Sequence, residues 1–187
     1  MASKLRVDHI EPVDGVPTGG GGGIIQVVFA EDNTAASLGA FTNNGADTPA
    51  AIMTANITPK SSTSKILVMC KGTVGVDENN VSGIEFSLHL SRTVGGSETR
   101  IGGNTQSGVF KGTKVHASGM HLGEAPLTLS FQYLDSPGTT AQVTYTLGAI
   151  GGESKTYYKN RGDSGSSYHY ANSGNSTITL MEVSAWH

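Results

Sequence analysis

The fold is decided by the stretch GIEFSLHL, residues 83–90, in which apolar residues alternate strictly with polar or small ones. Every even-numbered position is apolar, so these side chains share one face of an extended chain. This period of two residues is typical of a β-strand that buries only one face. Residues 126–133 repeat the pattern, and residues 176–183 are similar. The sequence therefore predicts strands in all three places.

Further strands are expected between and around these three, at residues 24–29, 52–58, 64–76 and 141–147. Residues 135–138, Asp-Ser-Pro-Gly, have turn chemistry, so the strands on either side of them are expected to pair as antiparallel neighbours. The polar stretch 31–49 predicts a long loop. No window has an apolar stripe at the helical period of 3.6 residues. The pattern predicts an all-β fold, an antiparallel β-sandwich or jelly roll.

The composition fits a loop-rich β protein and argues against several other classes. Of 187 residues 26 are glycine, only 14% are charged and the net charge is −3. The basic stripe of a nucleic-acid-binding module is missing, as are the apolar runs of a membrane span and of a signal peptide. Cys70 lies in an apolar run, so we expect a buried, unreactive thiol and folding in a reducing cytosol.

The N-terminal residues 1–23 differ from the rest and predict an attachment or stem segment. Residues 4–10 alternate as a short strand, with Leu5, Val7 and His9 on one face and Ile10 on the other. A glycine run at 19–23 follows, which is a linker rather than a phosphate cradle, because a strand and not a helix comes next. The lone strand must dock on another chain or return to the main domain, residues 24–187, because it is unstable alone.

The predicted sandwich has sheet edges that need cover, and the low charge gives little protection against edge pairing. Packing of identical copies around an axis would cover these edges. We therefore expect the protein's main partner to be itself.

Four segments, residues 3–18, 57–68, 133–140 and 176–183, resemble the C-terminal modules of bacteriophage fibre proteins, especially those of marine and cyanobacterial phages. The resemblance implies a virion structural protein that is assembled in the bacterial cytoplasm. It implies a homotrimeric β-rich knob behind a thin stem, with another virion protein bound through residues 1–23. The stem is short for a whole fibre, so a fibre tip, a short fibre and a decoration on capsid or tail all stay open. The family has no common catalytic motif.

The sequence predicts no enzyme, no cofactor and no metal. The G-x-S-x-G, H-E-x-x-H and Walker patterns are all missing, and the carboxylates form no recognisable acid–base pair by sequence. Histidines 116, 121 and 169 are interpreted as ordinary polar residues. His9 on the stem strand is the natural ligand if a metal lies on a threefold axis.

Residues 156–170 form the candidate binding segment, where four tyrosines and several planar polar groups surround a glycine-serine loop. Aromatic faces beside hydrogen-bonding groups suit sugar recognition. The alternative is that half of the tyrosines pack inside the sandwich. A fibre-tip adhesin for a host-surface glycan and a non-adhesive decoration protein are therefore the two functional hypotheses. The candidate receptor residues are Tyr157, Tyr158, Asn160, Arg161, Asp163, Tyr168 and Tyr170.

Overall fold

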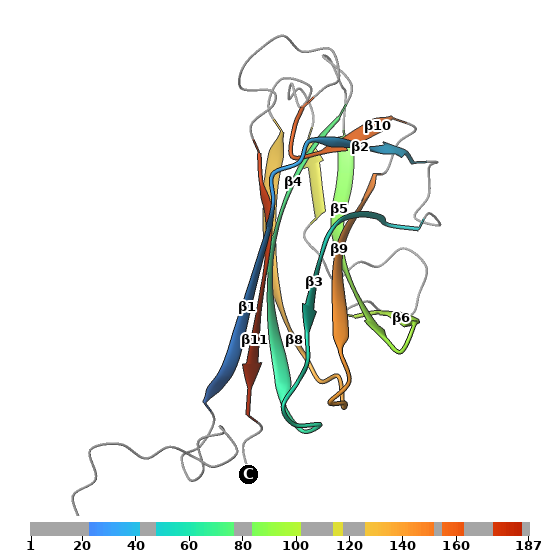
Figure 1. The fold of residues 1–187 in the computed structure, drawn as a ribbon. Coiled ribbons are helices and arrows are strands. Elements are labelled where there is room, and N and C mark those ends of the chain that lie inside the picture. Colours follow the sequence, from blue (N-terminus) through green and yellow to red (C-terminus); the bar gives the residue numbers. More distant parts are fainter. Residues whose placement is uncertain are drawn as a thin grey trace, which may run out of the picture.

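Two antiparallel β-sheets packed face to face make up the computed structural model, which describes residues 23–41, 48–76, 84–101, 114–117, 126–151, 155–162 and 174–184 (Figure 1). None of these residues is helical. The predicted all-β antiparallel sandwich is confirmed. Of the predicted stem segment 1–23, all but Gly23 lies outside the described residues.

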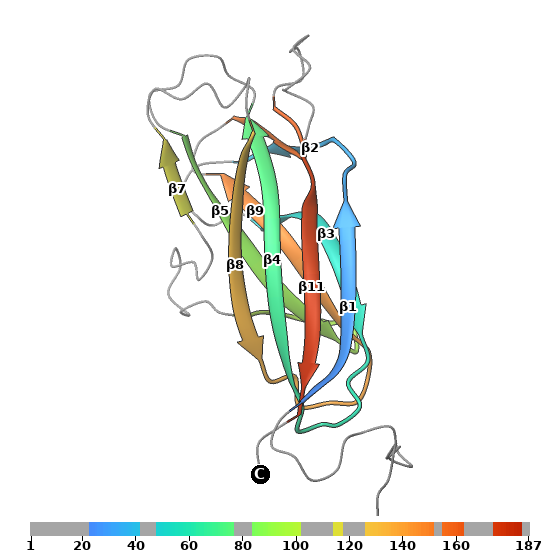
Figure 2. The same ribbon diagram turned by 90° about the vertical axis from the view of Figure 1, so that its left-hand side faces the viewer.

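Sheet A is built around its longest strand, β4. This strand pairs with β8 along one side, and with β11 and β10 in succession along the other. The neighbouring strands β8, β4, β11 and β1 lie side by side in Figure 2. The strands of sheet A are β1 (Ile24–Asp32), β2 (Ala36–Ala40), β4 (Lys65–Val76), β8 (Leu127–Asp135), β10 (Thr156–Lys159) and β11 (Ser176–Val183).

Sheet B has β9 at its centre, between β3 and β5, and β5 also pairs with β6 and β7. The β5–β6 hairpin turns at Gly95 and Gly96, which both have positive φ (56° and 83°), as a two-residue primed turn requires. The strands of sheet B are β3 (Ala50–Ile57), β5 (Ile84–Val94), β6 (Ser97–Arg100), β7 (Lys114–Ala117) and β9 (Val143–Gly151).

The core lies between the sheets and is filled by alternate residues of their strands. The even-numbered positions of β4, such as Ile66 and Val68, point inward and are fully buried. They face residues of sheet B such as Leu88 and Leu147, which are also fully buried. Each such aliphatic side chain contributes about 1.5–3 kcal/mol when it leaves water. The alternation read from the sequence is therefore the pattern that builds the core.

The predicted pairing of residues 126–133 with residues 141–147 is wrong. β8 pairs with β4 in sheet A, whereas β9 pairs with β3 and β5 in sheet B. The connection between β8 and β9 crosses from one layer to the other, with Gly138 at a positive φ of 67°. Sheets lie about 10 Å apart, so a connection that is longer than a two-residue hairpin loop can bridge them.

The predicted long loop at 31–49 is also wrong in part. β1 continues to Asp32, and Ala36–Ala40 forms β2, which pairs with β10. The strand β2 has little alternation of its own and takes its conformation from a partner more than a hundred residues further along the chain. Local sequence therefore carried no signal for it.

A buried carboxylate joins the two sheets at the end of β8. Asp135 is 4% exposed, and its two oxygens accept hydrogen bonds from Arg92 Nη1 of β5 at 2.9 and 3.0 Å. The hydroxyl of Tyr145 on β9 donates to the same carboxylate at 2.7 Å. Burial, and then the hydrogen bond to Asp135, raise the pKa of Tyr145. The hydroxyl is therefore held in the neutral form that can donate.

The substitution Tyr145→Phe is expected to lower the free energy of unfolding by about 1–3 kcal/mol, because it takes one donor from a buried carboxylate and keeps the ring. Urea denaturation measures this loss. The control Thr146→Val, on the neighbouring and more exposed position, should change stability by less than about 0.5 kcal/mol. Equal effects of the two substitutions would contradict the role given to Tyr145.

Candidate functional site

The described part of the segment predicted to bind a sugar, residues 156–162, begins with β10 of sheet A. β10 lies between β4 and β2. Tyr157 is 0% exposed, Tyr158 is 5% exposed and Asn160 is 0% exposed. The ring of Tyr157 meets Phe41 edge-on, with 5.2 Å between the ring centres. These three residues cannot offer a surface to a sugar, which corrects the prediction for them.

Arg161 follows β10 and is partly exposed, but it is engaged by its neighbours. Its guanidinium carbon lies 4.4 Å from the centre of the Tyr158 ring, a cation–π contact. Its carbonyl oxygen approaches β4 so closely that a Cβ on Gly75 would lie 2.2 Å away. The remaining predicted site residues lie outside the described residues, so their roles stay predictions: Asp163, Tyr168, Tyr170, Leu5, Val7, His9 and Ile10.

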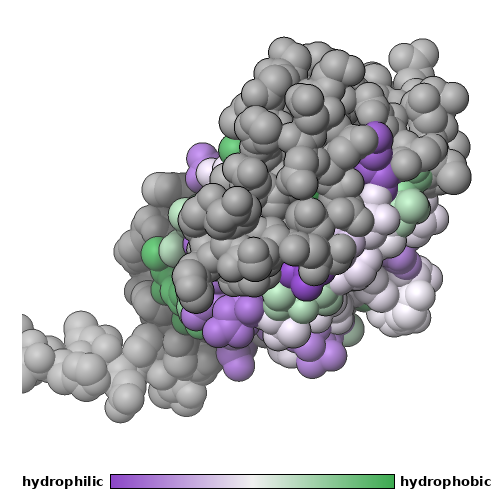
Figure 3. All heavy atoms as spheres, turned by 90° about the horizontal axis from the view of Figure 1, so that it is seen from above, coloured by the Kyte–Doolittle hydropathy of each residue, from purple (hydrophilic) through white to green (hydrophobic). Residues whose placement is uncertain are grey.

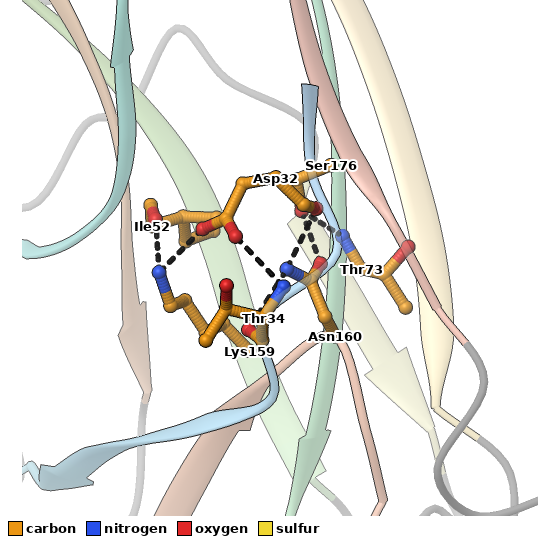
Figure 4. A network of polar contacts seen from close by, with 7 residues as sticks. All are labelled: Asp32, Thr34, Ile52, Thr73, Lys159, Asn160 and Ser176. Carbon is orange, nitrogen blue, oxygen red and sulfur yellow. Dashed lines mark hydrogen bonds and ion pairs between the residues drawn. The ribbon is translucent and has the colours of Figure 1, made fainter.

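Asn160 is the centre of a polar network at the end of β10 (Figure 4). Its backbone has a φ of 57°, which non-glycine residues rarely adopt. Its backbone N–H donates to the carbonyl of Thr73 on β4 at 2.9 Å, and its Nδ2 donates to the carbonyls of Asp32 and Thr34 at 2.9 and 3.2 Å. Its Oδ1 accepts from Ser176 Oγ of β11 at 2.7 Å. One side chain thus ties the end of β1 to β10 and β11.

Lys159 extends this network to sheet B. Its ammonium group donates to Asp32 Oδ2 and, at 2.8 Å, to the carbonyl of Ile52 on β3. Burial acts to raise the pKa of Asp32, but the hydrogen bonds from Lys159 and Thr34 outweigh it and the pKa is lowered. The groups satisfy one another across both layers, which is the arrangement of a structural network.

The outer face of sheet A, meaning the outward-pointing residues of β1, β11, β4 and β8, is the candidate functional site. Among the described residues, five large apolar side chains are exposed, and all five belong to β1, β4 or β8 of this sheet. Monomeric proteins seldom leave apolar side chains gathered on one face, and such patches mark interaction sites. The five residues, with their exposed fractions, are Ile24 (58%), Val27 (54%), Phe29 (63%), Met69 (40%) and Leu134 (49%).

Strand register places four of these five residues in two adjacent rows that cross four strands, whereas Ile24 pairs with Val183 outside the rows. In one row the apolar Phe29 and Met69 alternate with the polar Thr179 and Gln132. In the other row all four residues are apolar. In Figure 3 hydrophobic residues gather at the left of the molecule, the side on which sheet A lies in Figure 1. The rows are Phe29–Thr179–Met69–Gln132 and Val27–Met181–Leu67–Leu134.

A hollow of about 310 Å³ adjoins these rows between β8, β4 and β11. Met69 and Lys71 of β4 line it, and the β8 and β11 sides carry polar residues beside Phe131 of β8. The hollow therefore has an apolar wall, a cationic side chain and a polar rim. The polar residues on those sides are Ser130, Gln132 and Thr177.

The outermost strands of sheet A have unprotected edges. Within the described part of the chain β1 pairs only with β11, and β8 only with β4. Residues 24–30 and 127–134 carry no charge and no proline, the two devices that commonly prevent edge pairing. The sheet edges that were expected to need cover are therefore the outer edges of β1 and β8.

The sequence carried a signal for this face that the strand pattern alone did not resolve. Residues 24–29 are apolar on both faces of the strand, and Met181 and Val183 occupy outward positions of β11. Only the register with β4 and β8 shows that these residues share one surface.

Two further groups are buried in the sandwich. Cys70 is 3% exposed, as expected, and burial raises the pKa of its thiol to about 12. His89, 9% exposed, lies with its Nε2 3.0 Å from Ser87 Oγ. Burial, and then the charge of Arg100, lower the pKa of His89 to about 4. The polar face of β5 is buried as well as its apolar face, since Ser87 and Ser91 are 3% and 7% exposed.

The described residues contain no cluster of three or more histidine, cysteine or acidic side chains that could hold a metal ion. His116 lies in β7, and histidines 9, 121 and 169 lie outside the described residues. Within the same part of the chain, no helix has the length and apolar character needed to cross a bilayer.

No family model matches the chain, and no curated protein matches it in sequence. Among solved structures it is similar to a chain in the "Structure of infectious bursal disease virus Gx strain". The TM-score is 0.40 and the identity is 12%, with 84% of this chain and 39% of that chain covered. The chain thus spans well under half the length of that viral protein. This likeness is weak.

Two substitutions separate what the side-chain hydrogen bonds of Asn160 contribute to stability from what its positive φ costs. Asn160→Gly keeps the positive φ accessible and removes the side-chain hydrogen bonds, so the free energy of unfolding should fall by about 2–4 kcal/mol. Asn160→Ala should cost about 1 kcal/mol more, because alanine is disfavoured at this φ. Thermal and urea denaturation check both values, and a glycine variant as stable as the wild type would refute the network's role.

The buried His89 predicts a loss of stability in mild acid. Its pKa is about 6.5 in the unfolded chain and about 4 in the folded one, so the unfolded chain binds the proton first. The stability contributed by neutral His89 is complete above pH 6.5 and is lost as the pH falls toward 4, by on the order of 3 kcal/mol. Urea denaturation of wild type and His89→Gln across this range measures the effect. Parallel pH profiles of the two proteins would contradict it.

Proposed function

We propose that this protein is a structural component of a virus particle, a fibre-type module that assembles with copies of itself. The observation that carries the proposal is the outer face of sheet A, where two uncharged rows rich in apolar side chains lie between the outermost strands β1 and β8. A surface of this kind is unfavourable in water and is covered when chains associate. The resemblance of four sequence segments to phage fibre modules supports the virion and the homotrimer as the setting.

The N-terminal segment is proposed as the attachment arm. Residues 1–23 lead directly into β1, an outermost strand of sheet A. The arm therefore begins at an edge of the surface that neighbouring copies would cover. The arm would then hold a cluster of knobs on another virion protein.

Recognition of a host glycan is proposed for Arg161, which is partly exposed, and for Asp163, Tyr168 and Tyr170, which follow it in the sequence and lie outside the described residues. The burial of Tyr157 and Tyr158 removes half of the aromatic surface on which this function depends. That observation favours the second candidate, a non-adhesive decoration that stabilises the capsid or tail. Neither function requires a catalytic step.

Competition with infection separates the two candidates. An adhesin added as purified full-length protein is expected to reduce adsorption of the encoding virus to its host, and the double substitution Tyr168→Ala and Tyr170→Ala should abolish the reduction. Thr54→Ala, at an exposed position of β3 in sheet B, is the matched control and should compete like the wild type. A decoration protein would leave adsorption unchanged.

Immunogold electron microscopy of purified particles tests the part that both candidates share. Labelled particles are expected for the wild type, and deletion of residues 1–23 should abolish the label. Particles without any label would overturn the proposed function.

A further inference from the structure

We infer that the outer face of sheet A is the interface between copies of this chain, with Phe29 of one copy seated in the hollow beside Met69 of the next. The inference rests on the self-association in the proposed function, but not on the virion or on a receptor. The anchor is Phe29, the acceptor is the hollow beside Met69, and the partner is a second copy of the chain.

Phe29 is built as an anchor. It is the most exposed large apolar residue among those described, at 63%, and it lies on the outermost strand β1. Its inward neighbours Val28 and Ala30 pack against the core and fix the strand beneath it. A rigid aromatic side chain loses little conformational entropy on binding, and aromatic residues are frequent among those that dominate interface energies.

The hollow fits a phenyl ring. A cavity of about 150 Å³ is enough to bind benzene, and this hollow measures about 310 Å³. Met69 offers a thioether, which makes favourable contacts with aromatic rings. Lys71 donates to Asn175 Oδ1 at 2.6 Å, which fixes its ammonium group beside the hollow, where a cation–π contact becomes possible. The polar rim leaves the hollow solvated until an aromatic group displaces the water.

Phe29 is not among the residues that line the hollow of its own chain. In the row Phe29–Thr179–Met69–Gln132, the far side of the hollow lies three strand spacings from Phe29, about 14 Å at about 4.8 Å per spacing. Both ends of the row are held in one hydrogen-bonded sheet. The anchor and the acceptor lie on the same face, so two copies that pack outer face to outer face can each seat Phe29 in the hollow of the other, as a twofold contact does.

The exposed apolar area is sufficient for such a contact. Five side chains that each expose about half of their surface correspond to on the order of 500 Å², near the upper range of patches on monomers. The partly exposed Leu67, Met181 and Val183 extend the patch toward the ~800 Å² per partner of a standard interface. The rows carry no charge, so an equally apolar face of another copy suits them, whereas a charged partner does not.

The first test compares Phe29→Lys with the control Thr54→Lys, which adds the same charge on the exposed side of β3 in sheet B. Analytical ultracentrifugation of the full chain should show self-association that Phe29→Lys weakens at least tenfold and Thr54→Lys changes less than twofold. Both variants should melt at the wild-type temperature, because both positions are exposed. A monomeric wild type, or association indifferent to Phe29→Lys, would overturn the inference.

The second test traps the contact itself. In a chain with Phe29→Cys and Gln132→Cys the two thiols are too far apart to join within one sheet, and Cys70 is buried. Mild oxidation should therefore give doubly linked pairs or longer linked chains on a non-reducing gel, and a mixture of the two single variants should give linked pairs. Absence of these products would overturn the seating of Phe29. An internal bond in a chain with Val7→Cys and Gln132→Cys would overturn it too, because its own arm would then fill the hollow.

These results are distinguishable from failure of the proposed function. A chain that is linked through positions 29 and 132 but is missing from particles refutes the virion role alone. A chain that is present on particles but unaffected by Phe29→Lys refutes the interface alone.

Discussion

The pairing of β4 with neighbours on both of its sides is the constraint on which the rest of this structure depends. Because the strand is extended, its even-numbered residues, from Ile66 to Val74, fill the core, and its odd-numbered residues, from Lys65 to Lys71, form the outer face. A shift of register by one residue would exchange these two sets. The core and the candidate interface are therefore specified together, by alternate residues of one strand.

The end of β4 explains why the candidate binding segment became part of the sheet. β11 pairs with β4 as far as Lys71, and β10 pairs with Val74–Val76. Gly151 leaves room for the ring of Tyr157, since a Cβ there would lie 2.2 Å from it, and Gly75 leaves room for the chain at Arg161. The tyrosines of β10 complete the sandwich. The same composition that suits sugar binding also suits a core.

The sequence predicted the strands whose side chains alternate strongly. It did not predict the features that depend on partners far along the chain. The long strands β4, β5, β8, β9 and β11 were expected because one face of each had to be buried. The partner of β8 was misjudged, because turn residues indicate that a chain bends but not whether it stays in one layer. Gly95-Gly96 was a usable signal for the β5–β6 hairpin. Nothing local marked β2, and nothing local could place Phe29, Met69 and Gln132 in one row.

The polar groups that border the apolar rows would fix the position of a neighbouring copy in the proposed interface. Asn175 accepts from Lys71 and donates to Glu31, so a line of hydrogen bonds borders the rows on the side of the hollow. Lys65, near the opposite end of β4, is exposed and borders the rows there. Apolar rows alone would allow a neighbour to slide, because hydrophobic attraction is non-directional. A neighbour that slid onto either border would desolvate charge without a partner, which is costly. The apolar residues therefore supply affinity, and the borders restrict the neighbour to the position in which Phe29 meets the hollow.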